Sequence, residues 1–138
     1  MCGVHSGSKK WDDEKKLEYS MKLQKELSEL YGLISKLAII CIKRDIPLII
    51  ENPYSTQHYL TRYWSLQPKI IDTNRQRDGD YFMKPTQYWF INCEPENNIL
   101  FEPIEWVEEK KIENTGNQVE RSLIHPQYAN RFLRQYVL

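Results

Sequence analysis

Residues 47–53, PLIIENP, constrain the fold of this chain more than any other segment. An uninterrupted apolar run leads into a carboxylate, an amide and a proline. Such a run with a turn signal behind it predicts a strand buried on both faces, as in a parallel sheet. In open α/β sheets the carboxyl ends of the strands border the ligand crevice. Glu51 and Asn52 are therefore candidate site residues, although they would equally suit the start of a plain loop.

The segment before this strand predicts one long helix over residues 12–44. Two aspartates at its start suit an N-cap with an acidic first turn. Apolar residues then recur at helical spacing from Leu23 to Cys41, and Pro47 forbids continuation. Helix, turn and strand form the second half of a βαβ unit. We therefore expect fold class α/β, with part of a Rossmann-like sheet between a long amino-terminal helix and a carboxyl-terminal helix.

The rest of the chain is expected to complete a single domain spanning residues 1–138. Residues 47–107 are predicted to hold the strands and a connecting helix. Local patterns predict a flexible start at 1–11, a helix within 55–66, strands at 69–72, 84–93 and 99–107, an exposed loop at 108–120 and a terminal helix at 121–138.

Bulk properties exclude several classes of protein. Lysine plus arginine and aspartate plus glutamate both total 19, so the whole-chain charge predicts no general attraction to nucleic acid. The three cysteines are widely scattered without metal-type spacing, which favours reduced thiols in the cytoplasm and predicts no metal site. No apolar stretch reaches the length of a membrane span, so we expect no membrane partner.

Several short motifs occur in a fixed order that resembles a known family. They are CGVHS at residues 2–6, ENP at 51–53, RQRDGD at 75–80, KPTQYW at 84–89 and RSLIHPQYA at 121–129. Together they resemble the carboxyl-terminal half of the phage-type DNA cytosine-5 methyltransferases, over nearly the whole chain. The family's amino-terminal half, which binds S-adenosylmethionine, has no counterpart among these motifs.

The resemblance implies roles for individual residues. Enzymes of this family flip a cytosine out of the duplex, attack it with a cysteine thiolate and hold its edge with the glutamate of the ENP segment. Glu51 matches that glutamate, and Cys2 matches the nucleophile. Matches to the segments that surround the base, and so candidates for binding nucleic acid or a partner, are Asn52, Arg75, Arg77, Lys84 and Thr86.

The basic residues also have a simpler interpretation. Asp72, Asp78 and Asp80 alternate with Arg75, Arg77 and Lys84. The local field is then close to neutral, so a solvated loop is as consistent with the sequence as a phosphate clamp.

These features predict a methyltransferase-derived binding protein of phage or mobile-element origin that is not an enzyme on its own. We expect a counter-defence inhibitor of the anti-CRISPR or anti-restriction type, acting on a nucleic-acid-processing effector or its DNA. The alternative is one subunit of a split DNA cytosine-5 methyltransferase, which would use S-adenosylmethionine only when a partner chain completes the site. A truncated product without selected activity is the third possibility. An uncovered sheet edge would favour a protein partner or self-association.

Overall fold

The computed structural model describes residues 12–109 and 122–138. The chain divides into two compact units, Met1–Arg44 and Asp45–Leu138. The predictions for Cys2, for the start at 1–11 and for most of the loop at 108–120 lie outside the described residues.

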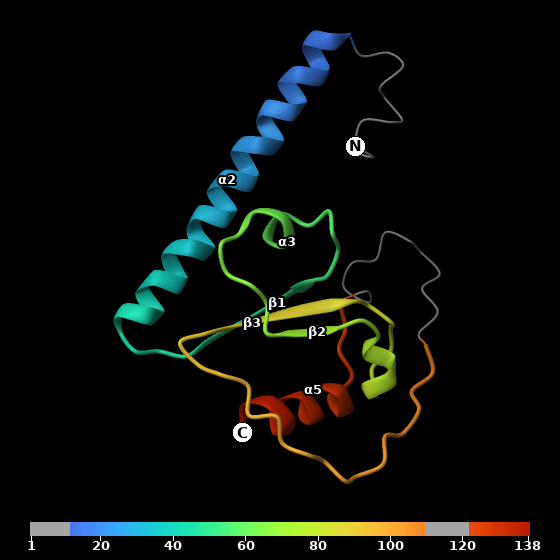
Figure 1. Ribbon diagram of the computed structural model, residues 1–138. Coiled ribbons are helices and arrows are strands. Elements are labelled where there is room, and N and C mark those ends of the chain that lie inside the picture. Colours follow the sequence, from blue (N-terminus) through green and yellow to red (C-terminus); the bar gives the residue numbers. More distant parts are fainter. Residues whose placement is uncertain (1–11, 110–121) are drawn as a thin grey trace. The chain divides into compact units, whose positions relative to one another are not determined.

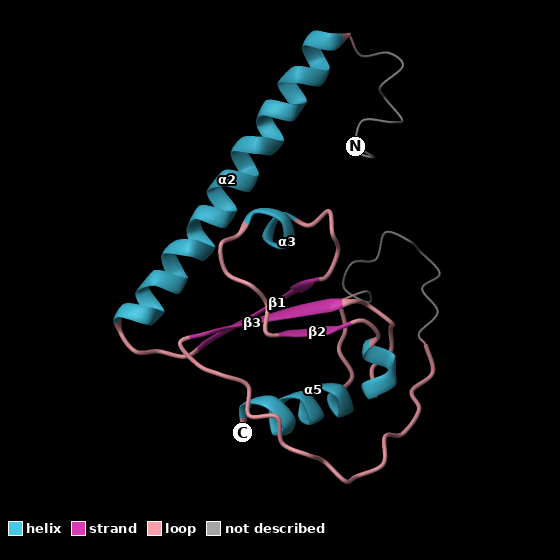
Figure 2. Cartoon of the chain, in the orientation of Figure 1, coloured by secondary structure: helices cyan, strands magenta, loops and turns pink. Residues whose placement is uncertain are grey.

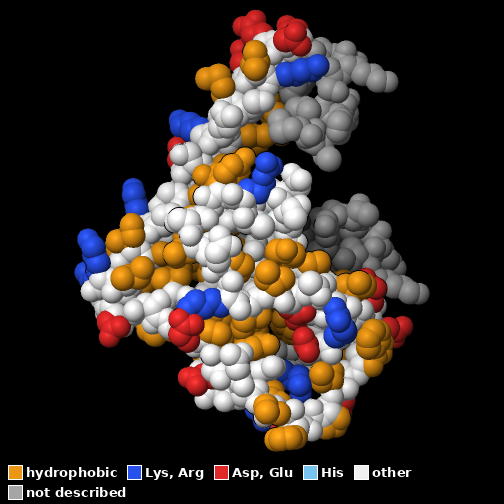
Figure 3. Space-filling view, viewed as in Figure 1, with side chains coloured by type: hydrophobic (Ala, Val, Ile, Leu, Met, Phe, Trp, Pro, Cys, Tyr) orange, Lys and Arg blue, Asp and Glu red, His pale blue; other side chains and the backbone are white. Residues whose placement is uncertain are grey.

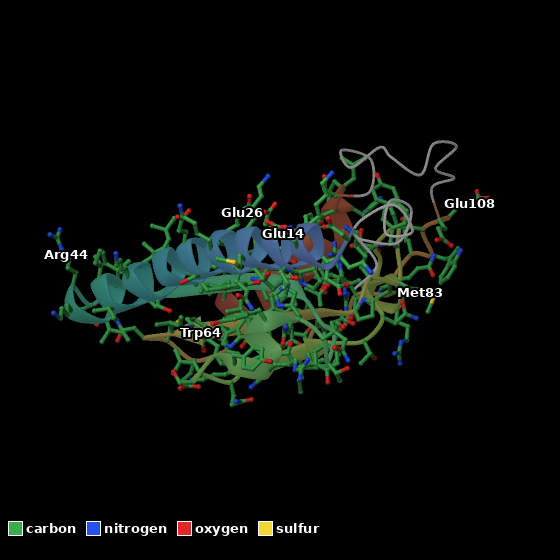
Figure 4. All side chains as sticks on the ribbon, turned by 90° about the horizontal axis from the view of Figure 1, so that it is seen from above. Glu14, Glu26, Arg44, Trp64, Met83 and Glu108 are labelled. Atoms are coloured by element: carbon green, nitrogen blue, oxygen red, sulfur yellow. The ribbon has the colours of Figure 1, made fainter. Side chains whose placement is uncertain are left out.

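The first unit contains the long helix α2, Asp13–Lys43, which confirms the helix predicted over 12–44. Asp12 caps it, because its carboxylate accepts a hydrogen bond from the Lys15 backbone N–H at 2.9 Å. The side chains of Glu14 and Glu26 project from the helix (Figure 4). Large hydrophobic side chains, among them Met21 and Leu33, are also exposed between the charged ones (Figure 3). No helix among the described residues is long and apolar enough to cross a membrane.

The second unit is built on a small antiparallel sheet (Figure 2). Its strands are β1, Leu48–Pro53, β2, Ile70–Asp72, and β3, Thr86–Ile91, in the order β1-β3-β2. The central strand β3 is buried along its whole length, whereas β1 is an outer strand and only half-buried. This corrects the expectation that PLIIENP lies buried on both faces of a parallel sheet, because the more apolar and aromatic β3 takes the central place.

Helices cover both faces of this sheet (Figure 1). On one face lies the short helix α3, Tyr59–Tyr63, where Thr61 Oγ1 accepts a hydrogen bond from Gln87 at 2.8 Å. On the other face lies α5, Pro126–Phe132, whose Phe132 ring is 4.3 Å from that of Tyr88. Since neighbouring residues of a strand point to opposite faces, β3 supplies side chains to two cores.

The structure contains the predicted carboxyl-terminal helix, but the strand that was predicted at residues 99–107 does not form. α5 continues directly into the π-helical turn η3, Leu133–Val137. Residues 99–107 contain no strand. That segment and the residue before it instead bond to the terminal helices: the backbone N–H of Asn98 donates to Gln135 O at 2.7 Å, and that of Glu105 donates to Gln127 Oε1 at 2.8 Å. Pro103, which cannot donate to a ladder, is consistent with this outcome.

Candidate functional site

Glu51 and Asn52 lie in the carboxyl-terminal half of β1, within the ladder that this strand forms with β3. In the β1–β3 register Glu51 is opposite Tyr88, and Asn52 is opposite Gln87. The pairing extends as far as Pro53, so both residues belong to the ladder. Because side chains alternate along a strand, Glu51 lies on the α5 face and Asn52 on the α3 face. The two predicted site residues are therefore separated by the sheet.

Arg75 is positioned by the 3₁₀ helix η2, Arg75–Asp78. The side chain of Asn74 caps this helix by accepting from the Gln76 backbone N–H at 3.0 Å. Gly79 ends it with a φ of +95°, a left-handed conformation that glycine adopts without strain. This turn directs Arg75 inward, toward the α5 face of the sheet.

The Arg75 guanidinium is buried among partners. It forms an ion pair with Asp80, lies 4.9 Å from the ring centre of Tyr128 and donates to Thr86 Oγ1 at 3.5 Å. Its Nε is also buried and has no hydrogen-bond partner within the described residues. Neither a solvated loop nor a phosphate clamp describes this arginine, because its charge is already compensated by Asp80.

One pocket brings four of the predicted site residues together. It has a volume of about 370 Å³. Its lining comprises Glu51, Arg75, Lys84 and Thr86, together with Pro53, Tyr54, Pro85, Ser122 and Ile124. The Glu51 side chain is exposed and makes no hydrogen bond or ion pair within the described residues. We call this cavity the Glu51 pocket; it offers a free carboxylate beside a fixed guanidinium.

The remaining predicted site residues lie elsewhere. Asn52 is on the opposite face of the sheet. Arg77 is exposed, donates to Thr73 Oγ1 at 3.0 Å and lines a different pocket. The resemblance placed both arginines of the basic loop near the base, but in η2 only Arg75 faces the Glu51 pocket.

Asp80 is an important residue that sequence reasoning left without a role. Its side chain is fully buried and accepts hydrogen bonds from the backbone N–H groups of Tyr81, at 2.7 Å, and His125, at 2.9 Å. It thus joins η2 to the start of α5 while it pairs with Arg75. The only local signal was its place at the end of the RQRDGD motif, whereas its partner His125 is 45 residues away.

A second polar network joins Tyr88, Tyr128 and Asp72 on the α5 face of the sheet. The hydroxyl groups of Tyr88 and Tyr128 are 2.7 Å apart, and the Tyr128 hydroxyl donates to Asp72 Oδ2 at 3.1 Å. Burial raises the pKa of Tyr88 to about 12, and burial together with the Tyr88 contact raises the pKa of Tyr128. Both phenols are therefore neutral hydrogen-bonding groups at physiological pH.

Side chains of the last motif of the resemblance, within the described residues 122–129, make internal contacts. The Gln127 amide donates to Glu105 O at 2.9 Å and Gly79 O at 3.3 Å, and Tyr128 binds Tyr88 and Asp72. These side chains do not fit a site for S-adenosylmethionine, so we derive no methyl-transfer step from them. The described residues also contain no cluster of His, Cys, Asp or Glu that could hold a metal ion.

Comparisons with known proteins add no assignment. No protein-family model, curated protein or solved structure matches the chain. Functional inference therefore depends on the Glu51 pocket and on the motifs that supply its residues.

Proposed function

We propose that the unit Asp45–Leu138 binds an unpaired cytosine base in the Glu51 pocket, as a methyltransferase-derived protein that does not transfer methyl groups on its own. The observation that carries this proposal is the meeting of Glu51, Arg75, Lys84 and Thr86 in one cavity. They come from three motifs of the resemblance, which are ENP, RQRDGD and KPTQYW.

The chemistry of the pocket suits a base presented outside a duplex. A carboxylate accepts hydrogen bonds from the exocyclic amino group of cytosine, and Glu51 has no competing partner among the described residues. Lys84 is exposed and lines the same cavity, so its ammonium adds a positive charge there. Arg75 would support the base position rather than bind a phosphate, because Asp80 holds it. The cavity thus combines one specific acceptor with one general cation.

The sheet is consistent with a partial Rossmann-like origin. Since β1 and β2 both pair antiparallel with β3, they run parallel to each other. Doubly wound sheets often carry an antiparallel strand near one edge of an otherwise parallel sheet. Under this proposal β1, β3 and β2 represent such an edge, and further strands would join at the outer side of β1.

This geometry also favours a second function, that of one subunit in a split DNA cytosine-5 methyltransferase. Within the described residues β1 has no strand on its outer side, and Glu51 lies in that strand. A partner chain that pairs along β1 would bring its own groups next to the Glu51 pocket. If the chain is a subunit of a split methyltransferase, DNA is methylated only when the partner chain is present. If the chain is a counter-defence inhibitor, it inhibits a nuclease or CRISPR effector in a cleavage assay.

Binding of labelled DNA tests the base-binding proposal directly. Fluorescence anisotropy would compare a duplex containing one mismatched cytosine with a duplex containing mismatched thymine at that place. We expect preference for cytosine, and a loss of about tenfold or more in Glu51→Ala, which removes the acceptor for the amino group of the base. Glu96→Ala is the matched control, since Glu96 is exposed and lines neither pocket described in this unit.

Two outcomes would contradict the proposal. One is equal affinity of the wild-type protein for both duplexes. The other is an identical affinity of Glu51→Ala and Glu96→Ala for the cytosine duplex, because only Glu51 lines the cavity.

A further inference from the structure

A second pocket in the same unit has no role in the proposed function. It has a volume of about 260 Å³, is formed by β2, η2 and the terminal helices, and shares no lining residue with the Glu51 pocket. We call it the Asp78 pocket. Sites for drug-sized ligands usually measure about 300–1,000 Å³, so this cavity fits one small ring system rather than an extended cofactor.

Aromatic side chains form one side of the Asp78 pocket. The ring centre of Phe132 lies 4.3 Å from that of Tyr88, 5.2 Å from that of Tyr136 and 6.5 Å from that of Tyr128, and all four residues line the pocket. Clustered aromatic rings favour a planar ligand, because flat heterocycles stack on them.

Two carboxylates supply hydrogen-bond acceptors on the polar side. Asp72 is held in place, since it accepts from the Tyr128 hydroxyl at 3.1 Å and from the Asn74 backbone N–H at 3.0 Å. Burial, together with the hydrogen bond and the charge of the neighbouring Asp72, raises the pKa of Asp78 to about 6. A ligand that brings its own N–H donors would relieve the repulsion between these two groups.

Two arginines balance this charge. Arg77 and Arg131 line the same pocket, so the ionised side chains of its lining sum to zero. The Nη1 of Arg131 donates to Glu102 O at 3.2 Å, whereas its Nε is buried without a hydrogen-bond partner in the described part of the chain. Buried N–H donors in proteins are usually hydrogen-bonded, so we expect a ligand to provide an acceptor for this Nε. The balanced charge favours a neutral ligand that presents donors and acceptors on separate edges.

We propose that the Asp78 pocket binds a guanine base. Guanine carries N–H donors at N1 and N2 on one edge, which match the carboxylates, and the acceptors O6 and N7 on another, which match arginine. Adenine lacks the paired donors, and its N6 amino group replaces the acceptor at O6. The base could come from a free nucleoside or from nucleic acid, since both present the same edges.

Calorimetric titration distinguishes these cases. The probes are guanosine, adenosine, a thymine oligonucleotide containing one guanine, and the same oligonucleotide with thymine in its place. We expect saturable binding of guanosine with at least tenfold discrimination against adenosine. Comparable affinity for the guanine oligonucleotide identifies the free nucleoside as sufficient, whereas tighter binding to it identifies nucleic acid as the source.

Variants separate this site from the Glu51 pocket. Asp78→Asn and, independently, Arg131→Lys should each weaken guanosine binding at least tenfold, with folding verified by circular dichroism. Glu51→Ala and Glu96→Ala should leave it unchanged, because neither residue lines the Asp78 pocket, so a failure of the cytosine proposal does not affect this test. Absence of saturable guanine binding, equal binding of adenosine, or full affinity in both pocket variants would overturn the proposal.

Discussion

Asp80 and Arg75 form an ion pair in which the side chains retain 0% and 4% of their accessible surface. Removing one partner of such a pair leaves an uncompensated buried charge, which costs about 3–5 kcal/mol. We therefore predict that Asp80→Asn lowers the free energy of unfolding by roughly that amount. The measurement is urea unfolding followed by tryptophan fluorescence.

The matched control is the exposed pair of Lys69 and Glu94. Glu94→Gln should change stability by no more than about 1 kcal/mol, because surface ion pairs contribute little. Equal effects of Asp80→Asn and Glu94→Gln would show that burial of Arg75 does not determine the stability of this unit.

The stability difference between the wild type and a variant that lacks the Asp78 carboxylate should depend on pH. Its pKa is 3.8 in the unfolded chain and about 6 in the folded protein, chiefly because of burial and then because of Asp72. The folded state therefore binds the proton more tightly, and the contribution of Asp78 to stability falls as pH rises from about 4 to about 6. Asp78→Asn, which cannot ionise, should be more stable than the wild type at pH 8.

This advantage should shrink as the pH falls through 6 toward 4, where wild-type Asp78 is protonated as well. Urea midpoints of both proteins at pH 4, 6 and 8 provide the measurement. A difference that stays constant across this range would show that ionisation of Asp78 carries no folding penalty.

The elements that could be predicted from the sequence are those set by local pattern. The period of apolar residues and the cap at Asp12 defined α2, and the proline-led segment at Pro126 defined α5. The sheet order could not be deduced, because pairing of β1 with β3 depends on distant residues. Only that pairing shows on which face of the sheet the side chains of Glu51 and Asn52 lie.

The candidate site residues stay a prediction, and the sequence motifs did not indicate which contacts connect them. The motifs named Glu51, Arg75, Lys84 and Thr86, which line one pocket. The contacts that fix this region join residues far apart in the chain, such as Tyr88 and Tyr128, which are 40 positions apart. No local periodicity encodes such a contact, so the network of Tyr88, Tyr128 and Asp72 could be recognised only from the fold.

The tyrosine pair predicts a measurable loss when one hydroxyl is removed. Tyr128→Phe deletes the hydrogen bonds to Tyr88 and Asp72 and leaves the buried Tyr88 hydroxyl and the half-buried Asp72 carboxylate without this partner. We expect a loss of about 1–3 kcal/mol in the free energy of unfolding. Tyr63→Phe is the control, because Tyr63 is 63% exposed, and it should change stability by less than about 0.5 kcal/mol. Equal stability of both variants would refute a structural role for the network.

Substitution by alanine should change stability in opposite directions at two glycines. Gly79 has a φ of +95°, and an added Cβ would collide with the Gln127 amide, which is held by hydrogen bonds to Gly79 O and Glu105 O. Gly79→Ala should therefore destabilise the Asp45–Leu138 unit by more than about 1 kcal/mol. Gly32 lies inside α2 with no atom within 4 Å of an added Cβ, so Gly32→Ala should stabilise that helix by about 0.5–1 kcal/mol. Thermal unfolding followed by far-ultraviolet circular dichroism measures both effects, and the same sign of change in both variants would contradict these backbone assignments.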